Sequence, residues 1–293
     1  DVESEVTVTA GATQAIFTAI AAFVRPGDEV LVFEPVYDSY VPAIETVGGK
    51  AVFAQLKFPD YAPDWAQVKS LINERTRMIV INSPHNPTGS LLTTADLDRL
   101  AELVRGTDIV ILSDEVYEHI LFDGERHASL CGRRELAARS IVVSSFGKTY
   151  HITGWKIGYV VGPAALMAEF RKVHQFNVFT VHAPSQLAIA EYMQDAARHL
   201  RLAAFYQEKR DFFRQLMAAT PFDLLPCRGT YFQLARYDRI SDLPDRAFAE
   251  WMTREVGVAV IPVSVFNADS RDDKVVRFCF AKREETLQAA AER

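Results

Sequence analysis

The chain has 293 residues, of which 49% are hydrophobic and 24% charged, and its net charge is −6. A chain of this length and composition is expected to fold around a large buried core, as one large domain with a smaller one. The acidic balance argues against nucleic acid or an anionic membrane as a partner, and no apolar run reaches the roughly 18 residues of a membrane span.

The chain opens with DVESEVTVTAG, which holds neither an initiator Met nor a signal-like segment. We therefore expect the natural start to lie upstream of Asp1. The three cysteines, Cys131, Cys227 and Cys279, are far apart, which predicts free thiols in a reducing, cytoplasmic compartment. The seven histidines show no metal-binding spacing, so no metal is expected.

The first two-thirds of the chain alternates short β-rich runs with helical patterns. Strands are predicted at 5–10, 29–33, 51–56, 78–82, 108–113 and 140–145, and helices at 12–24, 38–47, 64–73 and 94–105. This alternation is typical of βαβ units and predicts an α/β fold with a mostly parallel sheet sandwiched by helices. The strands are apolar throughout because both faces of such a sheet are buried.

A different pattern follows the strand predicted at 157–162. Helices are predicted at 164–177, at 183–218 (a stretch that could be interrupted), at 245–256 and at 283–293, with strands near 223–226, 230–235, 258–262 and 275–280. Fewer and shorter strands after a long helical connection indicate a second, α+β domain. We expect a large domain over 1–205 and a smaller one over 206–293.

Ligands of open parallel sheets bind beyond the carboxyl ends of the strands, so polar residues at those ends are candidates. Gly11, Ala12 and Thr13 follow the first strand and open a helix, whose free N–H groups favour a phosphate. Tyr37 follows the second strand, and Asn86 lies in the loop SPHNPTG after strand 78–82. Taken singly, each has a simpler explanation: Gly11 to Thr13 could form an ordinary βα turn, Tyr37 could be a core residue, and Asn86 could belong to an Asn-Pro turn.

An acid and an amine follow the next two strands. Asp114 ends the apolar run IVILS, where a buried carboxylate needs a cationic or hydrogen-bonding partner, although it could also cap a helix. Lys148 lies in SSFGKTYHITGWK, and the GKT within it suggests a nucleotide-binding loop. That loop requires GxxxxGK[ST], and Val142 occupies its first glycine position, so the residues favour a lysine that forms a Schiff base.

A carbonyl cofactor with a phosphate and a pyridine ring needs a phosphate cradle, a stacking ring, an acid for the ring nitrogen and an amine. The turn at Gly11 and the side chains of Tyr37, Asp114 and Lys148 supply these four parts from four strand ends. Tyr117 and Asn86 could hydrogen-bond the ring hydroxyl.

Arg277 lies inside VVRFCF, where a charge among apolar neighbours is costly unless it is paired. A guanidinium binds a carboxylate through two parallel hydrogen bonds, which suits an amino acid or a 2-oxo acid. The alternative is an arginine on the solvent face of an antiparallel strand.

These residues resemble fold-type I, pyridoxal-phosphate-dependent class I/II aminotransferases over essentially the whole chain. The resemblance rests on AGATQAIF, EPVYDSY, NSPHNPTG, LSDEVYEHI, SSFGKTYHITGWKIGY, RGTYFQL and VVRFCFAK, which occur in the family's order. Within the family the chain is similar to the branch of bacterial methionine aminotransferase and kynurenine–glutamine aminotransferase.

The resemblance implies a homodimer that uses pyridoxal 5'-phosphate to transaminate a methionine-like, aromatic or glutamine-like amino acid with a 2-oxo acid through an internal aldimine at Lys148. It implies catalytic roles for Lys148, Asp114 and Tyr117, and a substrate-carboxylate site at Arg277 and Asn86. It implies a cofactor site made of Gly11, Ala12, Thr13, Tyr37, Asn86, Asp114, Tyr117, Ser145, Lys148 and Lys156.

The chain departs from the family at Lys156, where arginine is frequent, and at its start, because family members begin further upstream. Lysine keeps the charge but loses the planar fork of arginine. Two alternatives use the same site: a β-lyase acting on cysteine S-conjugates or cystathionine, and a non-catalytic cofactor-binding regulatory module.

Overall fold

Eight strands form the main sheet of the computed structural model, which describes residues 1–293. Their order is β1-β8-β7-β6-β5-β2-β3-β4. Their bounds are β1 (Val6–Thr9), β2 (Glu29–Glu34), β3 (Lys50–Lys57), β4 (Ala62–Pro63), β5 (Thr76–Asn82), β6 (Val110–Asp114), β7 (Ser140–Ser145) and β8 (Gly158–Val161). The five central strands pair in parallel, whereas β8 and β4 pair with their neighbours in antiparallel fashion. The predicted α/β fold with a mostly parallel sheet is confirmed.

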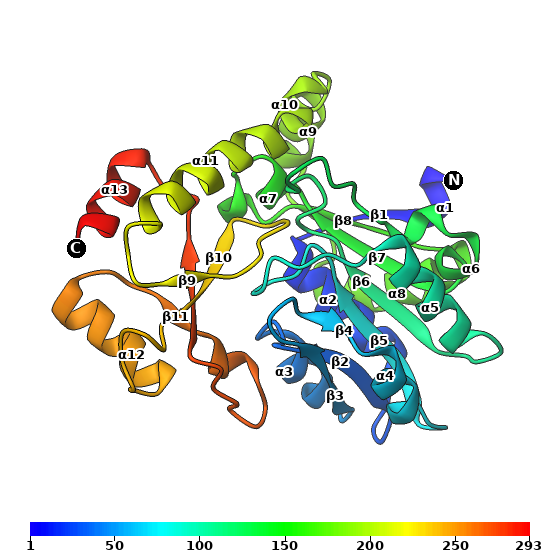
Figure 1. Cartoon of the computed structure of the whole chain (residues 1–293). Helices are drawn as coiled ribbons and strands as arrows, with labels where there is room; N and C mark the ends of the chain where they lie inside the picture. Colours follow the sequence, from blue (N-terminus) through cyan, green and yellow to red (C-terminus); the bar gives the residue numbers. More distant parts are fainter.

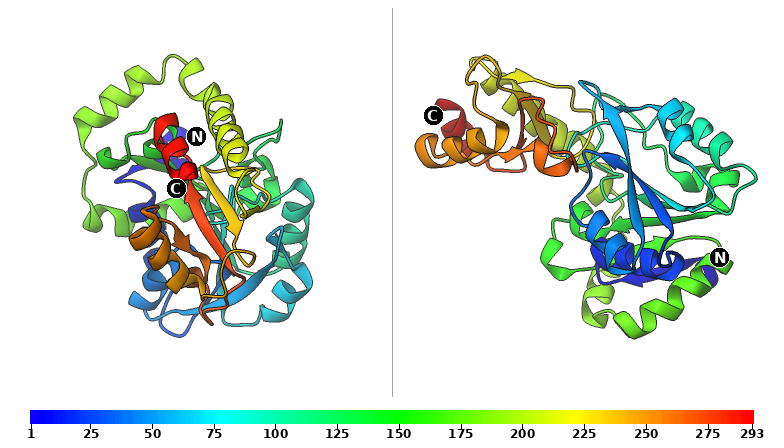
Figure 2. Two further views of the ribbon diagram at one scale, coloured as in Figure 1. Left: turned by 60° about the vertical axis from the view of Figure 1, so that its left-hand side comes forward. Right: turned by 90° about the horizontal axis from the view of Figure 1, so that it is seen from below.

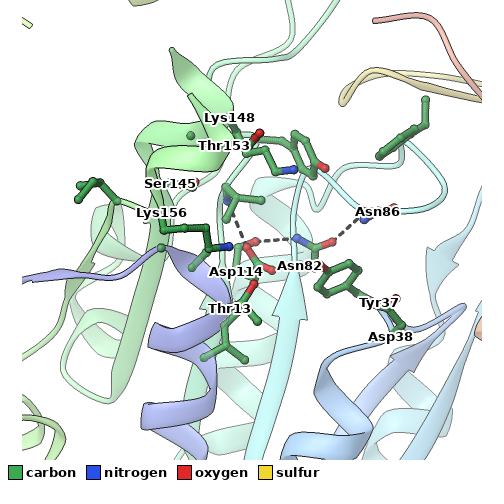
Figure 3. A pocket seen from close by; sticks show the side chains of 18 of the residues that line it. Thr13, Tyr37, Asp38, Asn82, Asn86, Asp114, Ser145, Lys148, Thr153 and Lys156 are labelled. Carbon is green, nitrogen blue, oxygen red and sulfur yellow. Dashed lines mark hydrogen bonds between the residues drawn. The ribbon is translucent and has the colours of Figure 1, made fainter. Parts of the chain in front are cut away.

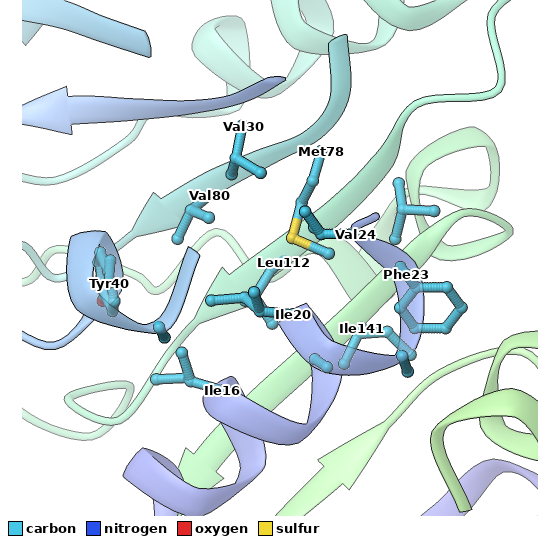
Figure 4. Close-up of a cluster of buried hydrophobic side chains, with 14 of the residues drawn as sticks. Ile16, Ile20, Phe23, Val24, Val30, Tyr40, Met78, Val80, Leu112 and Ile141 are labelled. Atoms are coloured by element: carbon cyan, nitrogen blue, oxygen red, sulfur yellow. The ribbon is translucent and has the colours of Figure 1, made fainter. Parts of the chain in front are cut away.

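Helices cover both faces of this sheet (Figure 1). They are α1 (Val2–Glu5), α2 (Ala12–Phe23), α3 (Tyr40–Thr46), α4 (Trp65–Leu71), α5 (Thr94–Val104), α6 (Arg134–Ala137), α7 (Phe146–Thr149) and α8 (Ala164–Asn177), with 3-10 turns η1 (Leu130–Gly132) and η2 (Thr153–Trp155). Successive side chains of a strand point to opposite faces. Met78 and Val80 of β5 therefore pack under α2 (Figure 4), while Ile79 and Ile81 pack on the other side with α4 and α5.

The long helical stretch predicted over 183–218 is three helices: α9 (Ala183–Tyr192), α10 (Ala197–Leu200) and α11 (Leu202–Met217). The prediction allowed for an interruption of this stretch, and the structure has one at Asp195. Its carboxylate accepts a hydrogen bond of 3.0 Å from the N–H of Ala197, which gives the backbone a local alternative to the helical ladder. None of the helices combines the length and the apolar character that crossing a bilayer requires.

A second, antiparallel sheet follows, in the order β11-β12-β10-β9. It consists of β9 (Asp223–Leu224), β10 (Phe232–Arg236), β11 (Ile261–Pro262) and β12 (Val275–Cys279), with α12 (Asp245–Trp251), a π-helical turn η3 (Met252–Val256), a 3-10 turn η4 (Val263–Phe266) and α13 (Glu284–Glu292). The strand predicted at 258–262 is only two residues long. Figure 2 shows this part set apart from the main sheet, and the division expected at residues 205 and 206 falls within α11. That division stays a prediction.

The chain returns to the main sheet just before β10, at Gly229. The N–H groups of Arg228 and Gly229 both donate to the carbonyl of Gly89, at 3.0 and 3.1 Å. A Cβ at Gly229 would lie 2.8 Å from the Cβ of Pro84 and 2.9 Å from the carbonyl oxygen of Ile120, so only glycine fits. This contact brings the first residues of β10 to the edge where β5 and β6 end.

Candidate active site

A cavity of about 330 Å³ lies at the carboxyl edge of the main sheet, where the second sheet meets it (Figure 3). All the predicted site residues line this one cavity: Gly11, Ala12, Thr13, Tyr37, Asn86, Asp114, Tyr117, Ser145, Lys148, Lys156 and Arg277. They come from the ends of β1, β2, β5, β6 and β7, from the turn before β8, and from β12 of the second sheet. The rule that ligands bind beyond the strand ends therefore located this cavity from the sequence.

Asp114 is the buried acid of the cavity, with 4% of its surface exposed. Its carboxylate accepts hydrogen bonds from the Tyr40 hydroxyl at 2.5 Å and from the N–H of Val116 at 3.3 Å. Burial raises its pKa to about 6, although the Tyr40 hydroxyl, the Val116 N–H and the charge of Lys148 act in the opposite direction. No helix starts there, so the helix-cap alternative is wrong. A cationic group beside Asp114 would stabilise its charged form.

Lys148 lies in α7, one turn beyond the end of β7. Its Nζ donates a hydrogen bond of 3.0 Å to the Tyr231 hydroxyl. The same nitrogen lies 5.6 Å from the ring centroid of Tyr117 and 5.7 Å from that of Tyr231. Burial first, and the neighbouring Tyr231 next, raise the pKa of Tyr117, so this phenol remains protonated at neutral pH. The amine thus faces the cavity among uncharged aromatic side chains.

One end of the cavity is suited to an anion. Gly11, with φ of +83°, precedes α2 and provides no side-chain cap, which leaves the first N–H groups of that helix free. Lys156 adopts a left-handed conformation with φ of +55°, and its Cε passes 3.6 Å from the position of a Cβ on Gly11. Gly158 allows β8 to pass close to the start of α2, because a Cβ there would lie 3.2 Å from the nitrogen of Ala12 and from the carbonyl carbon of Gly11. Ser145 adds a buried hydroxyl to the same end.

A chain of hydrogen bonds joins the two sheets across the cavity. Figure 3 shows its links from Asn82 to Asn86 and to Asp114. Arg277 donates to Oδ1 of Asn86 at 2.7 Å, and the N–H of Asn86 donates to Oδ1 of Asn82 at 2.8 Å. Asn82 Nδ2 in turn donates to the carbonyl oxygen of Asp114 at 2.9 Å. These hydrogen bonds fix the position of Arg277, in the second sheet, relative to Asp114 at the end of β6.

The guanidinium of Arg277 lies 4.1 Å above the ring centroid of Phe232 and 5.3 Å from that of Phe266. It lines the cavity, so the alternative of a solvent-facing arginine is wrong. Burial lowers its pKa without making it neutral at physiological pH, since an arginine stays protonated there. A positive charge between two aromatic rings at the cavity wall suits a ligand carboxylate.

Among the residues that were not predicted, three contact the predicted ones: Asn82 lines the cavity, the Tyr40 hydroxyl donates to Asp114, and the Tyr231 hydroxyl accepts from Lys148. The cavity-lining Asp38, Phe232 and Phe266 were not predicted either. Asn82 ends β5, so the rule that found Asp114 should have found it as well. Tyr40 follows Tyr37 by three residues at the start of α3, and its ring meets that of Tyr37 edge-on at 5.5 Å. Tyr231 lies in the motif RGTYFQL, but its place at the cavity depends on the contact between the two sheets.

The cavity fits pyridoxal phosphate part by part. The turn at Gly11, the start of α2 and Lys156 offer donors and positive charge to a phosphate. Burial raises the pKa of Asp114, and a protonated pyridine nitrogen beside it would stabilise the charged carboxylate. The Lys148 amine can bond an aldehyde, and Tyr37 offers an aromatic ring beside them.

The whole chain, residues 1–293, matches the family model described as aminotransferase class I and II. The chain is 49% identical to methionine aminotransferase of Escherichia coli, covering 100% of this chain and 76% of that protein. It is 35% identical to rat kynurenine–oxoglutarate transaminase 1, with 99% and 76% covered. The crystal structure of YbdL from Escherichia coli, whose reactivity identified a methionine aminotransferase function, superposes with a TM-score of 0.98 at 48% identity, with 100% and 78% covered. The chain therefore spans about three quarters of the length of these relatives.

A complete family match, relatives of this similarity and a cavity that fits the cofactor agree: the chain belongs to the class I and II aminotransferases and is a pyridoxal-phosphate-dependent enzyme that transaminates an amino acid.

Proposed function

We propose that the enzyme transfers the amino group of methionine, or of an aromatic or glutamine-like amino acid, to a 2-oxo acid. The observation that carries this proposal is the arrangement of the Lys148 amine, the Asp114 carboxyl and the Arg277 guanidinium around one cavity. The identity of 49% with methionine aminotransferase supports methionine as the donor. The rings of Phe232 and Phe266 beside Arg277 offer apolar surface to an uncharged side chain.

The cofactor, when bound, supplies an electron-withdrawing ring that stabilises negative charge at the substrate α-carbon. We assign its phosphate to Gly11, Ala12, Thr13, Ser145 and Lys156, and its ring to the aromatic side chain of Tyr37. The buried carboxylate of Asp114 would hold the proton on the ring nitrogen. Tyr117 and Asn86 would donate hydrogen bonds to the ring oxygen.

Lys148 moves the proton in this proposal. Its Nζ would hold the aldehyde of the cofactor in the resting enzyme. Once free, the amine would take the proton from the substrate α-carbon and give it to the former aldehyde carbon of the cofactor. Arg277 holds the substrate α-carboxylate, and Asn86 fixes the guanidinium through the hydrogen bond of 2.7 Å. The α-carboxylate and the amino group of the substrate are then both fixed relative to the Lys148 amine. Such fixed geometry is the main requirement for efficient proton transfer.

We further propose a homodimer in the cytoplasm. Three large apolar side chains between the end of α8 and the middle of α9 are almost fully exposed: Phe176 (87%), Phe179 (85%) and Leu187 (73%). Apolar surface concentrated on one segment is typical of a protein–protein contact. Three cysteines without a disulfide suit a reducing compartment. Sedimentation of the wild type and of Phe179→Asp tests the dimer, since this substitution is expected to shift the protein to monomer.

The test of the reaction is the visible absorbance of the enzyme with pyridoxal phosphate, before and after methionine is added without a 2-oxo acid. Methionine is expected to bleach the yellow band and to appear as its 2-oxo acid in equal amount. A band that persists would exclude methionine as the donor, and formation of ammonia from the substrate would indicate a lyase instead.

A further inference from the structure

Tyr231 lies directly before β10, next to the cavity residue Lys148, and has no part in the roles assigned above. Its hydroxyl accepts the one side-chain hydrogen bond that the Lys148 amine makes, at 3.0 Å. The nitrogen lies 5.7 Å from the centre of the Tyr231 ring, so the amine meets the hydroxyl and not the ring face. This contact joins the amine of Lys148, which follows β7 of the main sheet, to a residue next to β10 of the second sheet.

The ring of Tyr231 is held by its aromatic neighbours and not by Lys148. It meets Tyr117 edge-on at 5.3 Å and 86°, and Phe232 at 4.7 Å and 65°. Its other neighbour is Tyr206 of α11, at 5.6 Å. Edge-to-face pairs at such separations are the favoured arrangement of aromatic side chains. The hydroxyl is therefore a fixed acceptor, whereas the lysine that reaches it is a flexible chain of four methylene groups.

The backbone around Tyr231 is equally constrained. The buried Thr230 before it has φ of +65°, and its N–H donates to the carbonyl oxygen of Ile120 at 3.0 Å. The carbonyl oxygen of Tyr231 accepts a hydrogen bond of 3.1 Å from the N–H of Phe280. Together with the close approach of Gly229 to Pro84, these bonds fix the position of Tyr231 relative to both sheets.

We propose that Tyr231 is a positioning residue for the proton transfer carried out by Lys148. While the amine is free, it donates one N–H to the Tyr231 hydroxyl, and its lone pair remains available for the substrate α-proton. The hydroxyl accepts this hydrogen bond before and after the proton has moved, and neither gains nor loses a proton itself. Tyr231 thus keeps the base in place between removal and delivery of the proton. The proposal rests on the transamination proposed above.

Tyr206 offers a matched control. Its ring packs against Tyr231, but its hydroxyl lies 3.2 Å from Nδ1 of His151, whereas the Lys148 amine donates to Tyr231. Tyr206→Phe removes a hydroxyl beside Tyr231 and leaves the contact with Lys148 in place. Tyr231→Phe removes the acceptor of Lys148 and keeps the ring.

The first experiment measures single-turnover rates of the two cofactor-loaded variants with methionine and with α-deuterated methionine. Tyr231→Phe is expected to slow the half-reaction at least about tenfold at saturating substrate, because a misplaced base slows proton transfer. KM should change little, and the deuterium isotope effect should increase. Tyr206→Phe should match the wild type. Equal rates for Tyr231→Phe and the wild type, or an equal loss in both variants, would overturn the proposal.

The second experiment uses the protein without cofactor and does not depend on its activity. Melting temperatures are measured for Lys148→Met, for Tyr231→Phe and for the double variant. The two shifts should not add, because each substitution removes the same hydrogen bond. The pair Lys148→Met and Tyr206→Phe should add. Additive shifts for both pairs would overturn the contact. Failure of the wild type to react with methionine, with a non-additive Tyr231 pair, would instead count against the proposed substrate.

Discussion

The hydroxyl of Tyr40 donates a hydrogen bond of 2.5 Å to Oδ2 of Asp114, a carboxyl that is 96% shielded from solvent and whose pKa burial raises to about 6. The hydrogen bond favours the charged carboxylate, whereas burial opposes it. A cation beside Asp114 would stabilise the carboxylate further, and the protonated ring of the proposed cofactor would be such a cation.

Asp114→Asn is expected to change how the stability of the cofactor-free protein depends on pH. The folded pKa of about 6 lies above the ordinary value of 3.8, so the native state holds the proton more tightly. The stability that this group contributes is present below pH 4 and is lost as the pH rises through 6, a loss of about 3 kcal/mol. Urea unfolding at pH 4.5 and pH 8 should show the larger part of this loss, about 2 kcal/mol, in the wild type and not in the variant. Parallel pH profiles would contradict the raised pKa.

Tyr40→Phe should weaken cofactor binding about 10- to 100-fold, because a hydrogen bond to a charged group is lost beside the proposed ring site. Titration of cofactor-free protein with pyridoxal phosphate measures this change. Tyr61→Phe is the control, since the buried hydroxyl of Tyr61 has no hydrogen-bond partner and lies outside the cavity. Similar losses in both variants would show that the effect is not specific to Asp114.

Lys148→Ala should reduce the half-reaction with methionine by at least about 10³-fold, since it removes the base that moves the α-proton. The melting temperature should fall by only a few degrees, because Lys148 makes only the one side-chain hydrogen bond, to Tyr231. Stopped-flow absorbance measures the rate. Turnover close to that of the wild type would exclude Lys148 from the proposed role.

Arg277→Lys should raise the KM for methionine about 10- to 100-fold, because lysine cannot make two parallel hydrogen bonds to a carboxylate. The rate with an amine that lacks a carboxylate should not change. Steady-state kinetics with methionine and with 3-(methylthio)propylamine separates the two effects. An equal change for both compounds would show that Arg277 does not bind the carboxylate.

The sequence predicted the parts of the site that depend on a single strand and the residues directly after it. Asp114, Asn86 and Lys148 follow apolar strands, and parallel strands bring their carboxyl ends to one edge. Tyr231 could not be predicted in this way, because its place depends on the packing of Gly229 against Pro84. The position of the break at Asp195 could not be predicted, because helical periodicity continues on both sides of it and a local side-chain contact decides the conformation.

In the chain of hydrogen bonds that leads from Arg277 through Asn86 and Asn82 to the backbone of Asp114, each residue donates to the next. Because Oδ1 of Asn86 is taken by the arginine, the atom that this side chain can turn toward a ligand is Nδ2, a donor. The cavity therefore offers a hydrogen-bond donor at this point, which favours a ligand oxygen that carries a lone pair or a negative charge. An aspartate of nearly the same shape would reverse that preference and would also neutralise the arginine that the substrate needs.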